Sequence, residues 1–263
     1  MNRSECPVKI RAGLELANLT DVGLQRENNE DYYGYWEPDS DEEFLRKGRL
    51  AIVADGMGGH EGGEEASHLA VEAVRQVYRD SAGNPQDALL AGFQSAHQQI
   101  QLRARQDSQL SGMGTTCTAV ALADAYLSYA HIGDSRLYLV RNGNLTRLTT
   151  DHSHVTDLVN AGIIRPEDAE NHPDRHVLSK AMGVSDEFQP EVPHEPIPLS
   201  AGDILLLCTD GLWSLLNEQE LLDVLQTFSP TEACKELVRL VKQRGAPDNI
   251  TLQVLKLDTH GTN

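Results

Sequence analysis

The sequence predicts two β-sheets packed face to face, with helices on the outer side of both. Patterns typical of β-strands occur near both ends of the chain, within residues 14–35 and over residues 250–257. Between them, segments 64–79 and 89–100 place apolar side chains at the three- and four-residue spacing of amphipathic helices. Sheets and helices that are apolar on one side bury that side by stacking in layers. These observations favour a layered α+β fold.

The elements of the first third of the chain follow from local patterns. Residues 14–35 alternate short apolar groups with turn-forming residues, and the polar segment 38–47 precedes an apolar run at residues 50–54. This pattern predicts a hairpin with a long solvated loop. The two helical stripes that follow are expected to be core faces rather than binding surfaces.

The middle of the chain is rich in β-forming residues. Three runs, 116–123, 126–132 and 136–141, are separated by short breaks, and Asn142-Gly143 is a pair that favours a tight hairpin turn. We therefore expect this block to form antiparallel sheet.

The C-terminal part carries clear helix signals before the closing strand. A helical pattern covers residues 218–226. Ser229, Pro230 and Glu232 then occupy the cap, first-turn and third positions of a capping box, and Gly245 is a typical stop signal. We expect two helices here.

Length and charge restrict the class of protein. The chain has 263 residues with no Pro/Ser-rich linker, which favours one large domain. Its 40 acidic and 22 basic residues give a net charge of −18, which repels phosphate backbones and anionic lipid surfaces. Nucleic acid and membranes are therefore not expected partners.

Cysteine usage and hydropathy indicate a cytoplasmic protein. The four cysteines form no CxxC pair, and we expect them to be reduced core residues: Cys6, Cys117, Cys208 and Cys234. The first dozen residues lack a continuous apolar stretch, and no segment approaches the roughly 20 apolar residues needed to span a bilayer.

Two apolar runs end in the same dipeptide. Residues 50–54 lead into Asp55-Gly56, and residues 204–209 lead into Asp210-Gly211. A short apolar run bounded by turn residues is typical of a buried strand, so each carboxylate is expected where a core strand ends. An ionised aspartate in that position is costly without a nearby positive charge, and two of them suggest a shared cation.

Three further aspartates, Asp31, Asp134 and Asp248, also lie at predicted strand edges. If four of the five converged without counter-ions, each pair would repel by about 1 kcal/mol in water-like surroundings and about 4 kcal/mol near a protein surface. An oxygen-only set suits Mg²⁺ or Mn²⁺ far better than Zn²⁺. Two such ions can share a water, lower its pKa and clamp an in-line displacement at phosphorus. The aspartates thus predict hydrolysis of a phosphate ester.

Six motifs with these aspartates occur in a fixed order. They are Thr20-Asp21-Val22-Gly23 with Arg26, Asn29 and Asp31; Val53-Ala54-Asp55-Gly56-Met57-Gly58-Gly59-His60; Gly114-Thr115-Thr116; Gly133-Asp134-Ser135-Arg136; Thr209-Asp210-Gly211; and Asp248-Asn249. Together they resemble the motifs of the metal-dependent type 2C Ser/Thr protein phosphatases, and the Gly-Met-Gly-Gly-His form resembles the bacterial branch. The resemblance covers residues 14 to 257.

The resemblance implies a four-layer α-β-β-α sandwich of two antiparallel sheets flanked by helices, with metals at one end of the sheets. It implies a phosphatase catalytic domain over residues 14–258, an N-terminal extension at 1–13 and a C-terminal tail at 259–263.

By motif position, five groups are implied as ligands of two Mn²⁺ or Mg²⁺ ions. Asp55 would bridge both ions, the Gly56 carbonyl and Asp31 would complete one, and Asp210 and Asp248 would hold the other.

Three further roles are implied around the ions. Asp134 matches a position that contributes to a third, weaker metal in bacterial relatives. Arg26 would bind the substrate phosphate, which suits a planar fork that donates two parallel hydrogen bonds; taken alone, it is also a candidate for a salt bridge. His60 is a candidate catalytic acid for the leaving alkoxide, and a metal-bound water is the alternative. Glu30 stands where Gln is usual.

The motif threonines and histidines are expected to support the site rather than react. Thr115 and Thr116 are expected to hydrogen-bond around the ligands. A triad of Ser135, His131 and Asp134 is disfavoured, because adjacent strand residues point to opposite faces.

Residues 151–183 correspond in order to the family's flap, which lies beside the cleft and influences substrate choice. Four histidines in it match no strong ligand pattern and are expected to be solvated: His152, His154, His172 and His176. Ser179-Lys180 replaces the Thr-Arg pair common at this place.

The sequence therefore predicts a cytoplasmic, monomeric, Mn²⁺- or Mg²⁺-dependent phosphatase that hydrolyses phosphoserine and phosphothreonine in proteins by direct attack of a metal-bridging water. Its partners would be phosphorylated proteins and a Ser/Thr kinase that it opposes. One alternative is a non-catalytic phosphoprotein-binding module of the same fold. Retention of four mutually repelling carboxylates argues against it. A metal-dependent phosphodiesterase or nuclease is the other alternative, and the charge of −18 disfavours nucleic acid.

Overall fold

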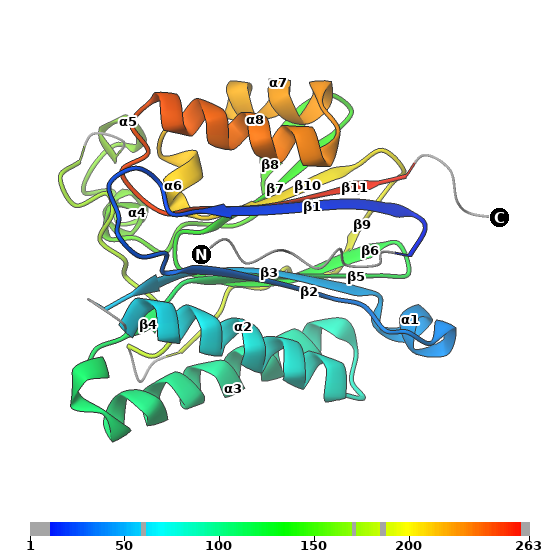
Figure 1. The fold of residues 1–263 in the computed structure, drawn as a ribbon, viewed down its shortest axis with the longest axis horizontal. Helices are drawn as coiled ribbons and strands as arrows, with labels where there is room; N and C mark the ends of the chain where they lie inside the picture. Colours follow the sequence, from blue (N-terminus) through cyan, green and yellow to red (C-terminus); the bar gives the residue numbers. More distant parts are fainter. Residues whose placement is uncertain (1–10, 59–61, 170–171, 185–187, 259–263) are drawn as a thin grey trace.

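The computed structural model describes residues 11–58, 62–169, 172–184 and 188–258, and it shows the four layers that were expected. Two antiparallel sheets lie face to face in the middle, with helices on the outer side of each (Figure 1). The prediction of an α-β-β-α sandwich is confirmed.

Both sheets are antiparallel throughout, and each is built from strands far apart in the chain. The first sheet has the order β1 (Leu14–Asp21), β11 (Ile250–Leu257), β10 (Ile204–Cys208), β7 (Arg136–Arg141) and β8 (Asn144–Arg147). The second sheet has the order β2 (Asp31–Trp36), β3 (Arg49–Met57), β5 (Cys117–Ala123), β6 (Tyr126–Ile132) and β9 (Ile197–Pro198), with β4 (Gly114–Thr115) beside β3.

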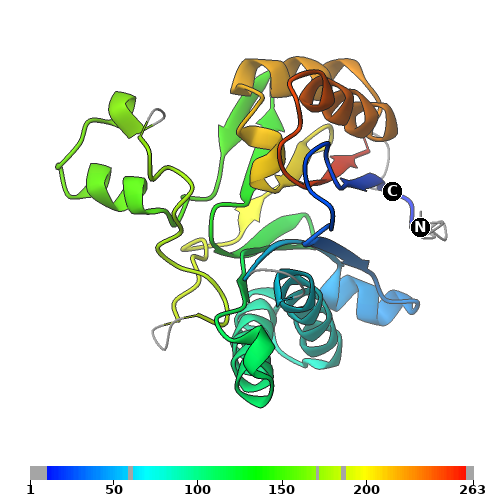
Figure 2. The same ribbon diagram turned by 60° about the vertical axis from the view of Figure 1, so that its left-hand side comes forward.

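The helices divide between the two outer layers and a projecting segment. Those on the second sheet are α2 (Gly62–Asp80) and α3 (Pro85–Gln106), followed by the short 3₁₀ turn η1 (Ser108–Leu110). Those on the first sheet are α6 (Asp210–Trp213), α7 (Glu218–Thr227) and α8 (Pro230–Gln243). Two short helices, α4 (His154–Asn160) and α5 (Pro166–Ala169), project away from the sandwich (Figure 2).

Strand β3 shows why the layers form. Its side chains alternate between two cores, because successive residues of a strand point to opposite faces. Leu50 and Ile52 pack toward α2 and α3, whereas Ala51 and Val53 pack between the two sheets. The strand is buried on both faces, as its continuous apolar sequence predicts.

The hairpin expected around residues 14–35 is only partly correct. Strand β2 does pair with β3, but β1 pairs with β11 in the other sheet. The segment between β2 and β3 is not simply a solvated loop, because it contains helix α1 (Asp41–Lys47). Ser40 caps this helix by accepting the Glu43 N–H at 3.2 Å.

The β-rich block of residues 116–141 is antiparallel, but it is divided between the sheets. Strand β5 pairs with β6 in one sheet, and β7 pairs with β8 in the other. The turn Gly133-Asp134-Ser135 carries the chain across, and Gly133 has a φ of +104°. Local patterns predict such strands without indicating the sheet to which each belongs.

The other expectations for the fold are confirmed within the described residues. The capping box of Ser229 and Glu232 is present at the start of α8. Three cysteines are buried and free, namely Cys117, Cys208 and Cys234, while Cys6 lies outside the described residues. Of the helices that the structure describes, none combines the length and apolar character required to traverse a bilayer.

Candidate metal-binding active site

All five predicted aspartates lie at the same end of the two sheets. Asp31 and Asp55 are direct cross-strand partners on β2 and β3. Asp134 lies in the turn between β6 and β7, Asp210 begins α6 after β10, and Asp248 lies just before β11. Because β7, β10 and β11 are neighbours in the first sheet, the last three aspartates lie at one sheet end.

Burial and mutual repulsion raise the pKa values of these carboxyl groups. Burial is the main cause for Asp31, whose pKa rises to about 7, and the charges of Asp210 and Asp248 add to it. The pKa of Asp55 is raised well above its usual range by burial and then by the Asp31 charge. Burial and the Asp210 charge do the same to the pKa of Asp134. The charge of each aspartate is therefore felt by others of the group, which shows that the carboxyl groups lie close together.

Two carboxylate oxygens in this group have no hydrogen-bond partner. Asp31 Oδ1 and Asp210 Oδ1 are buried and unpartnered, and Gln253 Oε1 is the third such side-chain atom among the described residues. A buried carboxylate oxygen without a donor is costly unless a cation meets it. The donor set consists of carboxylates and main-chain carbonyls, which fits the preference of Mg²⁺ and Mn²⁺ for oxygen.

Threonines orient the strand ends that carry Asp31 and Asp55. Thr209 Oγ1 donates to Asp31 Oδ2 at 2.8 Å. Thr115 Oγ1 donates to the Asp55 carbonyl at 2.9 Å, and Thr116 Oγ1 accepts the Asp55 N–H at 3.0 Å. Thr115 and Thr116 thus hydrogen-bond to the main chain of Asp55, in agreement with their expected role around the ligands.

Gly56 cannot be replaced by a larger residue in this backbone arrangement. A Cβ added there would lie 2.0 Å from the Gly63 carbonyl oxygen and 2.7 Å from that of Glu30. The Gly56 N–H donates to the Glu30 carbonyl at 3.1 Å. The glycine therefore allows three chain segments to meet beside Asp55.

Asn249 links the segments that carry the candidate ligands. Its Oδ1 accepts the Glu30 N–H at 2.8 Å, and its Nδ2 donates to the carbonyls of Val22 and Asn28 at 3.0 and 2.9 Å. Its own N–H donates to Asp248 Oδ1 at 2.8 Å. This buried amide fixes the loop between β1 and β2 against Asp248.

Arg26 lies on that loop and points to the carboxylate cluster. Its Nη2 donates to Asp248 Oδ2 at 2.8 Å. This hydrogen bond raises the pKa of Arg26, and the charges of Glu30 and Asp55 also raise it. About half of the side chain is exposed. The salt bridge considered in the sequence analysis is therefore present, and it places the guanidinium beside the aspartates.

Sequence reasoning missed the residues that hold the Asp134 turn from the far side. Trp213 Nε1 donates to the Asp134 carbonyl at 2.9 Å, and the Trp213 ring stacks against the Arg136 guanidinium at 3.5 Å. Arg136 in turn binds Asp151 through both nitrogens that face it. The only signal was Arg136 in the fourth motif, since Trp213 lies 79 residues from Asp134.

The histidines have different environments. His60 lies outside the described residues, so its catalytic role stays a prediction. His154 and His176 are exposed as expected, and His176 Nδ1 lies 3.6 Å from Asp210 Oδ2. The expectation of a solvated loop residue is wrong for His152, whose side chain is 11% exposed because it packs beside His131.

Comparison with known proteins places this arrangement in a family. The family model for protein phosphatase 2C matches residues 25–243. The chain belongs to the protein phosphatase 2C family. This protein phosphatase 2C chain is 36% identical to protein phosphatase PhpP of Streptococcus pneumoniae over 250 residues, which cover 93% of this chain and 98% of PhpP.

Solved structures of related phosphatases have the same fold. The serine/threonine phosphatase PstP of Mycobacterium tuberculosis superposes with a TM-score of 0.83 at 36% identity, covering 93% of this chain and 99% of the PstP chain. A further structure, the PstP catalytic domain in complex with two manganese ions, has a TM-score of 0.80 at 35% identity and covers 93% and 98% of the two chains.

Proposed function

We propose that this chain is a Mn²⁺- or Mg²⁺-dependent phosphatase that hydrolyses phosphoserine and phosphothreonine in proteins. The main observation in support is that five aspartates converge and that two buried carboxylate oxygens, on Asp31 and Asp210, have no hydrogen-bond partner. Family membership and the two manganese ions of the PstP structure support the proposal. The proposed catalytic domain spans residues 14–258, between the segments 1–13 and 259–263.

The proposed ligands are those that the family motifs imply. Asp31, Asp55, the Gly56 carbonyl, Asp210 and Asp248 would together hold two ions, with Asp55 shared between them. Asp134 would hold a third, weaker ion. When bound, the ions would supply Lewis-acid activation of water for in-line attack on phosphorus.

Arg26 is the proposed binding group for the substrate phosphate. Asp248 holds the guanidinium next to the carboxylates by a 2.8 Å hydrogen bond, which leaves its other nitrogens free to donate to phosphate oxygens. Asn249 fixes the loop that carries Arg26, so the guanidinium is preorganised to bind phosphate. Because dianionic phosphate approaches a chain of charge −18, this cation also offsets local repulsion.

The protein substrate has room beside the site. A groove of about 1050 Å³ runs between α4, α5 and the α6–α7 region, and it contains four arginines: Arg136, Arg147, Arg175 and Arg244. His176, which lines the same groove, contacts Asp210. We propose that a substrate segment next to the phosphorylated residue lies here, that a Ser/Thr kinase is the opposing enzyme, and that the protein acts as a cytoplasmic monomer.

The test is turnover of a phosphothreonine peptide with added Mn²⁺, Mg²⁺ or chelator, for wild type and Asp55→Asn. Wild type should release phosphate only with metal, and Asp55→Asn should lose at least about a thousandfold, because uncatalysed phosphomonoester hydrolysis is extremely slow. Absence of turnover together with tight phosphopeptide binding would identify a non-catalytic module. Cleavage of a cyclic dinucleotide in preference to the peptide would identify a phosphodiesterase.

A further inference from the structure

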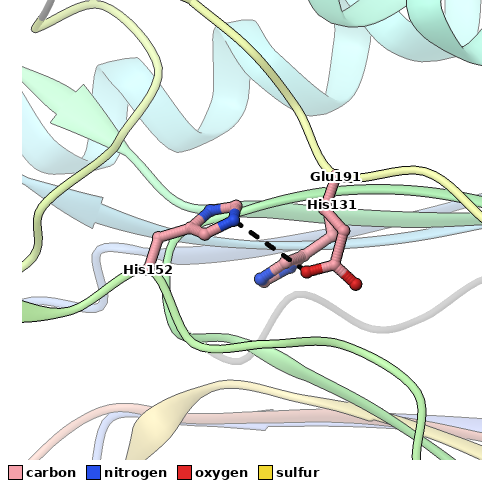
Figure 3. Close-up of side chains that lie close together, drawn as sticks. All are labelled: His131, His152 and Glu191. Carbon is pink, nitrogen blue, oxygen red and sulfur yellow. Dashed lines mark ion pairs between the residues drawn. The ribbon is translucent and has the colours of Figure 1, made fainter. Parts of the chain in front are cut away.

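A second group of polar side chains lies outside the aspartate cluster. It consists of His131 on β6, His152 at the start of the flap, and Glu191, which follows the flap (Figure 3). The two imidazole rings are 5.0 Å apart between centroids, and His152 Nε2 lies 3.9 Å from Glu191 Oε2. Each residue offers an atom that is within 4.8 Å of the others. Residue types and spacing alone would allow a transition-metal site.

The hydrogen bonds of the two histidines oppose a metal at this place. The Gly133 N–H donates to His152 Nδ1 at 3.2 Å, so the neutral ring carries its proton on Nε2, the nitrogen that faces Glu191. His131 Nε2 lies 3.2 Å from the Thr150 carbonyl, which can only accept, so this nitrogen also carries a proton. A metal needs the lone pairs that these nitrogens lack.

Glu191 is hydrogen-bonded to residues on both sides of the histidine pair. Its carboxylate accepts from Tyr129 Oη at 3.1 Å and from the Thr150 N–H at 3.0 Å. Its main chain exchanges two hydrogen bonds with that of His131, at 2.8 and 2.9 Å. The segment that leaves the flap and the segment that enters it are therefore both tied to β6.

His152 connects this set to the turn that carries Asp134. Its side chain takes the Gly133 N–H, and its own main-chain N–H donates to the Gly133 carbonyl at 2.7 Å. Its carbonyl accepts the Ser179 N–H at 2.9 Å, across the flap. His152 thus binds both polar main-chain groups of Gly133, and it links the start of the flap to Ser179 near the end of the flap.

Gly133 has little freedom to adjust. Its φ is +104°, and a Cβ there would lie 2.5 Å from the Thr116 side chain. The next residue, Asp134, is held from the opposite side by Trp213 Nε1 at 2.9 Å. A displacement of His152 would therefore be transmitted to the Asp134 main chain rather than absorbed by the glycine.

We propose that His152 is a positioning residue that holds the base of the flap and the Gly133-Asp134 turn as one unit. The importance of that turn for catalysis rests on the proposed phosphatase function. In this view the His131, His152 and Glu191 group is a structural joint and not a metal site: His131 and Glu191 are hydrogen-bonded through their main chains, and the His152 ring packs against that of His131.

The test compares His152→Leu, His152→Asn and the control His154→Leu, a change at the neighbouring exposed histidine. Trypsin cleavage of the metal-free protein after Arg175 and Lys180 in the flap reports its attachment. His152→Leu should be cleaved at least tenfold faster than wild type. His152→Asn should stay within about threefold, because its Oδ1 can accept the Gly133 N–H in place of Nδ1. His154→Leu should match wild type.

Steady-state kinetics on a phosphothreonine peptide separate positioning from general loss of structure. His152→Leu should lower kcat at least tenfold with little change in KM, and His152→Asn should restore most of kcat. If His152→Leu does not fold, His152→Gln serves instead, since its amide oxygen lies too far along the side chain to replace Nδ1.

Several results would overturn the proposal. Unchanged cleavage of His152→Leu would exclude a joint at this place, and equal kcat losses in the leucine and asparagine variants would exclude the Nδ1 hydrogen bond as its basis. If wild type bound one equivalent of Zn²⁺ with a micromolar Kd and His152→Leu did not, the group would be a metal site. The cleavage comparison needs no catalysis, so it still tests the joint if wild type shows no turnover.

Discussion

Asp31 and Asp55 occupy directly opposed positions on the antiparallel strands β2 and β3. Like charges in cross-strand register destabilise a sheet, and burial makes the repulsion stronger than it would be in water. Burial is the main reason why the pKa of both carboxyl groups is raised; the Asp31 charge raises the pKa of Asp55 further, and the charges of Asp210 and Asp248 do so for Asp31. A bound divalent cation converts this repulsion into shared coordination, which gives a structural reason for metal dependence.

Asp55→Asn should stabilise the metal-free protein while abolishing activity. Removing one charge relieves repulsion with Asp31, so the free energy of unfolding in chelator should rise by at least about 1 kcal/mol. Mn²⁺ at a hundredfold excess over its Kd should stabilise wild type by about 2.7 kcal/mol and the variant much less. Urea unfolding with and without Mn²⁺ measures both effects. Asp39→Asn, a change at an exposed site, is the control, and a destabilised metal-free Asp55→Asn would contradict the account.

Arg26→Ala should have opposite effects on catalysis and on metal affinity. Loss of charged hydrogen bonds to the phosphate should lower kcat/KM by about 10- to 100-fold, equivalent to 1.5–3 kcal/mol. Loss of the cation beside Asp248 should make Mn²⁺ bind more tightly. Peptide kinetics and calorimetric titration with Mn²⁺ measure the two effects, with the exposed Arg105→Ala as control. Weaker Mn²⁺ binding by Arg26→Ala would show that the guanidinium supports the metal site rather than competing with it.

Asn249→Ala should destabilise the protein by about 2 to 4 kcal/mol. The substitution leaves the Glu30 N–H and the carbonyls of Val22 and Asn28 without their hydrogen-bond partner. Chemical unfolding measures this cost. Asn144→Ala, at an exposed position of β8, should change stability by less than about 0.5 kcal/mol. Equal effects of the two substitutions would show that the hydrogen bonds of Asn249 do not stabilise the loop between β1 and β2.

Much of the fold was predictable because it depends on local patterns. The apolar stripe of α2, the capping box at Ser229 and the bounds of β11 all follow from short-range chemistry. The assignment of β1 to a hairpin failed because its partner, β11, lies more than 200 residues away. Pairing at that distance leaves no local signal in one sequence.

The candidate site divides in the same way. The aspartates were predictable from their positions after apolar runs and from the family motifs. The contacts of Trp213 with Asp134 and of His152 with Gly133 were not, because they depend on how separate elements pack. A buried histidine and an exposed histidine look alike in sequence: His152 is largely buried, whereas His154, two residues later, is exposed.

Acid should weaken the fold partly through the histidine pair. Burial, the main cause, lowers the pKa of His131 to about 3 and that of His152 to about 4, from about 6.5. Lys180 lowers the pKa of His152 further, against the opposing charges of Asp157 and Asp151. The unfolded chain therefore binds more protons below pH 6.5, and each histidine removes up to about 1.4 kcal/mol of stability per pH unit as the pH falls toward its folded pKa.

Urea unfolding in chelator at pH 7, 6 and 5 tests this for wild type and His152→Gln. The variant should be less stable at pH 7, and its deficit should shrink as the pH falls, because it lacks one of the two histidines. The carboxylate contributions are shared by both proteins and cancel in the difference. A deficit that stays constant from pH 7 to pH 5 would show that His152 is not held neutral by the fold.

The central claim is that the carboxylates at the sheet ends form the metal site. The most direct measurement is a crystal structure of the protein soaked in Mn²⁺, with anomalous scattering used to locate the ions. The account predicts two strong anomalous peaks, both within coordination distance of Asp55, one also near Asp31 and the other near Asp210 and Asp248. Strong peaks only elsewhere, for example between His131, His152 and Glu191, would contradict it.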